Sequence, residues 1–203
     1  MYALVKSGTI TKYFNSAKGF MVGDVQYSSD IFTKWSVEEK EAIGIHEVIF
    51  DDSNKKYEQW YINTNQTFAF ANNTVTASYG SATAKAHADT LWTAQDETDG
   101  KGTEGEVASR GLKYNLIKDL KIQVANELSK TDWYITRNTE KSTAIPSSIS
   151  THRDAVRTKQ AQMETAITNA SDTPALEALH TYTTTDSEGV QSRPLGELPV
   201  LES

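Results

Sequence analysis

The stretch LKYNLIKDLKIQVANELSK, residues 112–130, carries the clearest structural pattern in the chain. Its apolar residues recur every three or four positions, which places them on one face of a helix. The residues of that face are Leu112, Leu116, Ile117, Leu120, Val124 and Leu128. We therefore predict a helix from Glu104 to Lys130.

A second helical pattern begins near Pro146, whose fixed φ suits a first turn, and ends near Asn169. Its inward positions are Ile149, Val156, Met163, Ile167 and Ala170. Ser171-Asp172 is then expected to cap a short helix from Pro174 to Leu179. Two long helices joined by a short link predict an antiparallel helical hairpin, which alone buries little surface and is expected to dock on something.

The link between these helices, residues 131–137 with the sequence TDWYITR, is more apolar than a solvated loop. We expect Trp133 and Ile135 to close the end of the hairpin. Arg153 and Arg157 lie one turn apart on the second helix, so each can pair with an acidic residue on the facing helix or on a partner.

The first 80 residues have a different pattern, in which short aromatic and β-branched runs alternate with Gly, Asn, Asp and Ser. The spacing of Ser36 and Glu39 predicts one short helix with a capping box, which Gly44 can end. The turns are expected at residues 51–54 and at Asn72-Asn73. The expected strands are Tyr2–Lys6, Thr9–Phe14, Glu47–Asp51, Glu58–Ile62, Gln66–Phe70 and Thr74–Ser78.

Together these patterns predict an α+β protein. A small N-terminal antiparallel β domain with one short helix is expected over residues 1–80, and a polar linker rich in Ala, Thr, Gly and acidic residues over 81–106. The helical hairpin domain follows over 107–180 and an extended C-terminal tail over 181–203. The tail mixes polar residues and prolines with a few apolar residues, so we expect it to lie on a partner.

Composition excludes several classes of function. The net charge is -7 without a basic cluster, which disfavours direct nucleic-acid binding. The chain has no cysteine, hence no disulfide and no thiolate nucleophile or metal ligand. An apolar run of about 18 residues and a secretory leader are both missing from the sequence, so we expect a chain that is made in a cytoplasm and does not enter a membrane.

The sequence contains partial matches to known catalytic and metal-binding motifs, but the residues around each match do not fit the motif. Residues 100–105, GKGTEG, spell the dinucleotide fingerprint, but an acidic run precedes them and would repel phosphate. His46-Glu47 lacks a second histidine at position 50, and Asp51, Asp52 and Asn54 lack the alternating calcium-loop pattern. We therefore predict no catalytic residue, no metal ligand and no cofactor, and do not expect an enzyme.

The first domain also holds an aromatic cluster, which consists of Tyr57, Trp60, Tyr61, Phe68 and Phe70. Such rings can stack on sugars, but on paired strands they are more often core residues and cross-strand pairs. We favour the core interpretation and keep a host-glycan-binding module as an alternative.

Residues 128–137, LSKTDWYITR, followed by Ala144-Ile145-Pro146 and by residues 153–157, RDAVR, resemble a helical-hairpin segment of tailed-bacteriophage proteins associated with tail fibres. In that tail-fibre-assembly-like family a T-D-W-Y-x-x-R stretch, an A-I-P and an R-x-x-x-R helix follow one another. The resemblance covers roughly Gly111 to Leu179, and residues 2–8, YALVKSG, also resemble the start of such proteins. It implies no catalytic residue.

The resemblance implies a non-enzymatic component of a phage virion. We expect a tail or tail-fibre adaptor that is made in the host bacterial cytoplasm and binds other phage tail or tail-fibre proteins in multiple copies. A tail-fibre assembly chaperone that leaves before the virion is complete is the main alternative. The expected partner-binding residues are Trp133, Arg137, Arg153, Arg157, Leu198 and Leu201.

Overall fold

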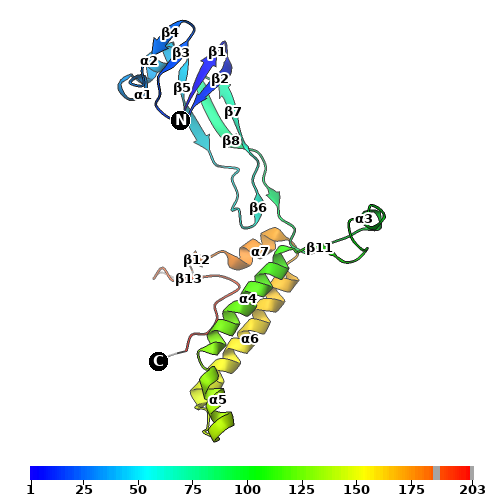
Figure 1. The fold of residues 1–203 in the computed structure, drawn as a ribbon. Helices are drawn as coiled ribbons and strands as arrows, with labels where there is room; N and C mark the ends of the chain where they lie inside the picture. The colour runs from blue at the N-terminus through cyan, green and yellow to red at the C-terminus, as the bar shows by residue number, and fades with distance from the viewer. Residues whose placement is uncertain (185–187, 202–203) are drawn as a thin grey trace. The chain divides into compact units, whose positions relative to one another are not determined.

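The computed structural model describes residues 1–184 and 188–201, and its fold is α+β (Figure 1). The chain divides into two compact units, Met1–Thr83 and Ala84–Ser203. The short strand β9 (Thr83–Ala84) spans the boundary.

The first unit is built on a five-stranded sheet in the order β2-β1-β5-β8-β7. The strands of this sheet are β1 (Tyr2–Lys6), β2 (Thr9–Phe14), β5 (Ile45–Asp51), β7 (Gln66–Ala71) and β8 (Thr74–Tyr79). The shorter strands of the unit are β3 (Phe20–Val22), β4 (Val25–Tyr27) and β6 (Tyr61–Ile62).

The sheet is mixed, whereas the sequence predicted an antiparallel one. Strands β5 and β8 pair in parallel, with Val48 opposite Val75, and the other ladders of the sheet are antiparallel. Because β7 and β8 form a tight hairpin at Asn72 and Asn73, which both have positive φ, β8 returns beside β5 in the same direction. Turn signals locate strands along the chain but do not fix which strands become neighbours.

Each face of the sheet buries its own apolar cluster, because alternate residues of a strand point to opposite faces. Leu4 of β1 belongs to one cluster, with Phe14, Phe20, Ile31, Phe32 and Ile45. Ala3 and Val5 belong to the other, with Val48, Val75 and Ala77.

Two short helices lie in this unit, where one was predicted. The predicted helix is α2 (Val37–Ala42), and its capping box is confirmed: Ser36 N donates to Glu39 Oε2 at 2.8 Å, and Glu39 N donates to Ser36 Oγ at 3.2 Å. The additional helix is α1 (Ile31–Lys34), whose N-cap residue Asp30 is of a favoured type but makes no side-chain capping hydrogen bond. It is held by the burial of Ile31 and Phe32.

Most of the aromatic cluster serves packing. Trp60 is 2% exposed, and Phe68 and Phe70 pack against the second apolar cluster. The rings of Tyr13 and Phe68 lie 4.7 Å apart and join the two edge strands β2 and β7, so that the sheet curls. Tyr57 differs from these residues in that it is 66% exposed.

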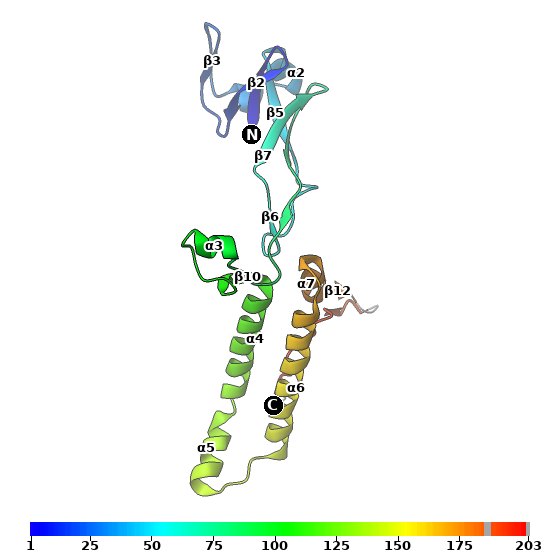
Figure 2. The ribbon, with the colours of Figure 1, turned by 90° about the vertical axis from the view of Figure 1, so that its right-hand side faces the viewer.

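The second unit contains helices and short strands. Its helices are α3 (Ala94–Thr98), α4 (Leu112–Ser129), α5 (Asp132–Lys141), α6 (Ser147–Asn169) and α7 (Thr173–His180). Its short strands are β10 (Thr90–Leu91), β11 (Val107–Ser109), β12 (Thr183–Thr184) and β13 (Gln191–Ser192). Helices α4 and α6 lie side by side (Figure 2).

Helix α6 begins directly after Pro146 and ends at Asn169, as predicted. Its predicted inward residues are all buried, and they are Ile149, Val156, Met163, Ile167 and Ala170. Helix α4 buries Leu120 and Val124 but begins at Leu112 instead of Glu104. The start is fixed at Gly111, whose N–H donates to Asp89 Oδ1 at 2.8 Å and whose backbone lies against the Ala88 carbonyl.

The segment expected to be a polar linker contains ordered structure. Strands β10 and β11 pair antiparallel and enclose α3, which is capped by a second capping box made by Thr93 and Asp96. We call residues 90–109 the arm. The polar composition was interpreted as a linker because capped short helices and strands of two or three residues bury too little to show a hydrophobic period.

The residues predicted as a link between the long helices are instead the start of α5. Trp133 is 50% exposed and Ile135 39% exposed, so the expectation that they close the helix ends is wrong. Buried Thr131 and Arg153 occupy that position. Ser142, with φ at 49°, ends α5.

Part of the tail packs on its own unit, whereas the strands β12 and β13 are exposed and project from the helices (Figure 1). Leu195 is 5% exposed, and its N–H donates to Leu179 O at 3.0 Å. Residues 185–187 and 202–203 of the predicted tail lie outside the described residues.

Candidate protein-protein interface

A partly exposed aromatic and basic cluster lies on the first turns of α5. The rings of Trp133 and Tyr134 are 3.7 Å apart, and the Arg137 guanidinium lies 4.9 Å from the Trp133 ring and 5.8 Å from the Tyr134 ring. Among the described atoms, Arg137 Nε is buried without a hydrogen-bond partner. Ring contact thus positions the guanidinium. We call these three residues the α5 cluster.

Arg153 fixes the base of this cluster from α6. Its Nη1 donates to Leu128 O at 2.8 Å, to Thr131 Oγ1 at 2.7 Å and to Asp132 Oδ1 at 2.9 Å. The side chain of Arg153 is only 10% exposed, so its charge is directed to the junction of α4 and α5. Charge-assisted bonds of this kind are stronger than neutral ones and orient the α5 helix.

A second polar group supports the same junction. Glu127 accepts a hydrogen bond from Lys130, and Glu127 Oε1 lies 3.3 Å from His152 Nε2 without hydrogen-bond geometry. The Lys130 hydrogen bond lowers the pKa of Glu127, against the opposing effect of burial. The carboxylate therefore stays charged between α4 and α6 at neutral pH.

The six residues that the sequence singled out for partner contact do not form one surface. Trp133 and Arg137 come together in the α5 cluster, whereas Arg153 is buried and paired with the facing helix, one of the two roles that its spacing allowed. Arg157 is exposed and lies 3.4 Å from Asp154 of its own helix.

The two tail leucines, Leu198 and Leu201, are half-buried within the second unit. Pro199, Val200 and Leu201 border a surface cavity together with residues of α6, among them Thr151 and His152. The tail therefore follows α6 of its own unit in this structure.

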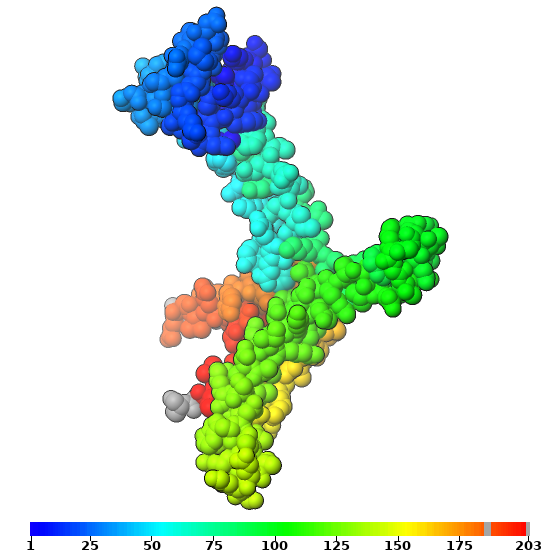
Figure 3. Space-filling view, in the orientation of Figure 1, coloured from blue at the N-terminus to red at the C-terminus, as the bar shows by residue number. Residues whose placement is uncertain are grey.

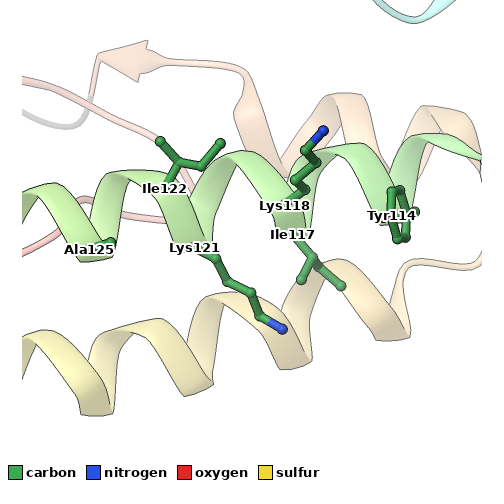
Figure 4. A pocket seen from close by; sticks show the side chains of 6 residues that line it. All are labelled: Tyr114, Ile117, Lys118, Lys121, Ile122 and Ala125. Carbon is green, nitrogen blue, oxygen red and sulfur yellow. The ribbon is translucent and has the colours of Figure 1, made fainter.

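Sequence reasoning did not identify a further exposed surface on α4 (Figure 4). It is lined by Tyr114, Ile117, Lys118, Lys121, Ile122 and Ala125, which we call the α4 flank. Tyr114 is 43% and Ile122 51% exposed. The available signal was a second set of helically spaced apolar positions, offset from the face that carries Leu120 and Val124.

The described residues, 1–184 and 188–201, contain no group of three or more His, Asp or Glu side chains that could hold a metal ion. In the same residues, no helix combines the length and the apolarity needed to span a bilayer.

Comparison of the chain with protein families, with curated proteins and with solved structures finds no match. A proposal for its function therefore rests on the sequence and on the geometry described above.

Proposed function

We propose that this chain is a non-enzymatic structural component of a tailed-phage virion, a tail or tail-fibre adaptor that binds neighbouring tail proteins. In this proposal residues 1–80 are a β domain, and α4, α5 and α6 form a helical hairpin that carries the binding surface. The observation that carries the proposal is the α5 cluster, where a half-exposed tryptophan lies against an arginine within the motif that resembles tail-fibre-associated proteins.

The motif divides into an internal part and an external part. In the internal part, the buried Arg153 donates hydrogen bonds to buried Thr131 and to Asp132. Trp133, which is 50% exposed, and the partly exposed Arg137 of the same motif lie outside this hydrogen-bonded group, with the Arg137 guanidinium over the Trp133 ring. The hydrogen bonds of the internal part hold the external part in place. A binding surface that is held rigidly loses less conformational entropy when a partner binds.

The chemistry of the external part suits a protein partner. Trp, Tyr and Arg are the residues most enriched at positions that dominate binding energy in protein interfaces. A stacked Trp and Arg loses little side-chain freedom on binding and can still offer guanidinium N–H groups to a carboxylate or carbonyl.

Retention of variants in virions tests the proposal. A phage that lacks this gene is complemented with the wild-type chain, with Trp133→Ala/Arg137→Ala, or with Thr139→Ala as the matched control, since Thr139 is exposed on another side of α5. We expect the wild type and the control to remain in gradient-purified particles and the double variant to be lost from them. Interface positions of this kind contribute at least about 2 kcal/mol each, enough to deplete the bound chain severely.

Equal retention of the double variant would contradict a role for the α5 cluster. Absence of the wild-type chain from the particles would instead favour the assembly chaperone, which binds the fibre subunit and then leaves.

A further inference from the structure

The α4 flank and the arm are opposite in charge. The flank combines exposed apolar residues with Lys118 and Lys121 (Figure 4), and at one end the Arg110 guanidinium lies 4.2 Å from the Tyr114 ring. The flank is thus locally basic although the whole chain has a net charge of -7. A contact surface of this kind favours an acidic apolar partner.

A symmetric contact between two α4 flanks does not meet that requirement. Such a contact repeats the same patch on both copies, which would bring Lys118 and Lys121 of one copy toward those of the other. Like charges placed opposite each other in an interface are strongly unfavourable.

The arm supplies the complementary surface. Leu91 and Val107 face each other across β10 and β11 and are 50% and 37% exposed. Glu104 and Glu106, both exposed, precede Val107 in the chain. The arm contains five carboxylates and one lysine, so an apolar pair is bordered by negative charge.

The arm is held in shape before any contact. Gly102 lies directly against the Trp92 indole, where no side chain would fit. Lys101 Nζ lies 3.0 Å from Asp96 Oδ1 and 3.1 Å from Asp99 Oδ2. A preorganised surface loses less conformational entropy on binding than a flexible loop would.

The arm does not reach the α4 flank of its own chain. Its base is fixed at the start of α4, because Gly111 N donates to Asp89 Oδ1 at 2.8 Å and Arg110 Nη1 lies 2.5 Å from Asp89 Oδ2. Leu112 N and Lys113 N donate to the carbonyls of residues 86 and 87. The arm projects away from α4 (Figures 1 and 3).

We propose that the arm of one copy binds the α4 flank of a second copy, through contact of Leu91 and Val107 with Ile122 and through pairing of Glu104 and Glu106 with Lys118 and Lys121. Because each copy carries both surfaces, two copies can exchange arms in a closed dimer, or the contact can repeat head-to-tail from copy to copy as a ring or a filament. The inference deepens the proposed function, resting on its multi-copy structural role.

Charge reversal on the full-length chain tests this contact. The mass of the purified protein is followed against concentration by sedimentation velocity for the wild type, for Lys118→Glu/Lys121→Glu and for Glu104→Lys/Glu106→Lys. Lys18→Glu/Lys56→Glu is the control matched to Lys118→Glu/Lys121→Glu, because it makes the same charge change on exposed lysines of the first unit.

We expect the wild type and the control to associate, and each of the two interface variants to associate at least about tenfold more weakly. Combining the four interface substitutions in one chain restores the complementary charges and with them the association. A monomeric wild type, an association that neither variant weakens, or a combined variant that does not recover would each overturn the proposal.

Cross-linking gives a second reading that does not depend on charge. A photoreactive residue replaces Ile122 in an equal mixture of isotopically light and heavy chains. We expect mixed-isotope cross-links to the peptide that spans residues 91–107, whereas links within one chain or to another region would contradict the proposed contact. Both measurements use purified protein, so their failure is distinguishable from loss of the chain from virions.

Discussion

At the scale of single residues, Arg153 holds the junction of α4 and α5 through its side-chain hydrogen bonds. Truncation by Arg153→Ala removes three hydrogen bonds from the junction of α4 and α5 and leaves buried Thr131 without its charged donor. Because the Asp132 side chain is 60% exposed and regains water, we expect a loss of about 2 kcal/mol in the free energy of unfolding. Urea unfolding measures this value.

Arg157→Ala is the matched control, since Arg157 lies one turn further along α6 and its side chain is 52% exposed. A change within about 0.5 kcal/mol is expected there. Equal effects of the two substitutions would show that Arg153 does not hold the junction.

Asp96 is expected to titrate at an unusually low pH. Hydrogen bonds from the Thr93 hydroxyl, and then from Lys101, lower its pKa from 3.8 to about 2. Because the folded pKa is depressed, the contribution of Asp96 to arm structure is fully present above about pH 4 and is lost as the pH falls through about 2. Carboxyl-carbon NMR titration checks the value, and Lys101→Ala should raise it; an ordinary pKa in the wild type would contradict the arm geometry.

At the scale of elements, the start of α4 depends on a close approach of two backbones. A Cβ at Gly111 would collide with the Ala88 carbonyl, so Gly111→Ala must displace the base of the arm from the helix. We expect a loss of about 2 kcal/mol, measured by thermal unfolding, and faster amide exchange in the first turn of α4. Ser109→Ala, at an exposed position, serves as the control. A Gly111→Ala variant as stable as the wild type would contradict the close approach of Gly111 to the Ala88 carbonyl.

The elements that could be predicted from sequence are those with a local signal. Helix α6 has a proline start and a repeating apolar face, and α2 has a capping box; both match the structure. The expected role of Trp133 was wrong because an apolar residue next to a helix end looks the same in sequence whether it is buried or exposed. Which residues are buried at this helix end depends on Arg153, which donates a hydrogen bond to Asp132 and lies 21 positions beyond it in the sequence.

Other features have no local signal at all. The parallel pairing of β5 with β8 and the packing of α1 depend on contacts between distant segments. Of the α5 cluster, Trp133 and Arg137 were identified from sequence, whereas the α4 flank was not, because Ile117 was assigned to the buried face and Ile122 was left out of the pattern. Amphipathic pattern predicts the buried face of a helix better than a second, exposed one.

At the scale of the whole molecule, the second unit presents two different surfaces. The α5 cluster is proposed to bind neighbouring tail proteins, and the arm and α4 flank are proposed to bind further copies of the chain. Such a division suits a multi-copy adaptor, since the two contacts use separate residues and can form at the same time.

Quantitative mass spectrometry of gradient-purified particles of the encoding phage tests the central claim most directly. The structural role predicts that this chain is present at a fixed ratio to the tail proteins and stays at that ratio through repeated purification. Abundance in the infected lysate together with absence from the particles would contradict it and leave the transient assembly chaperone as the better account.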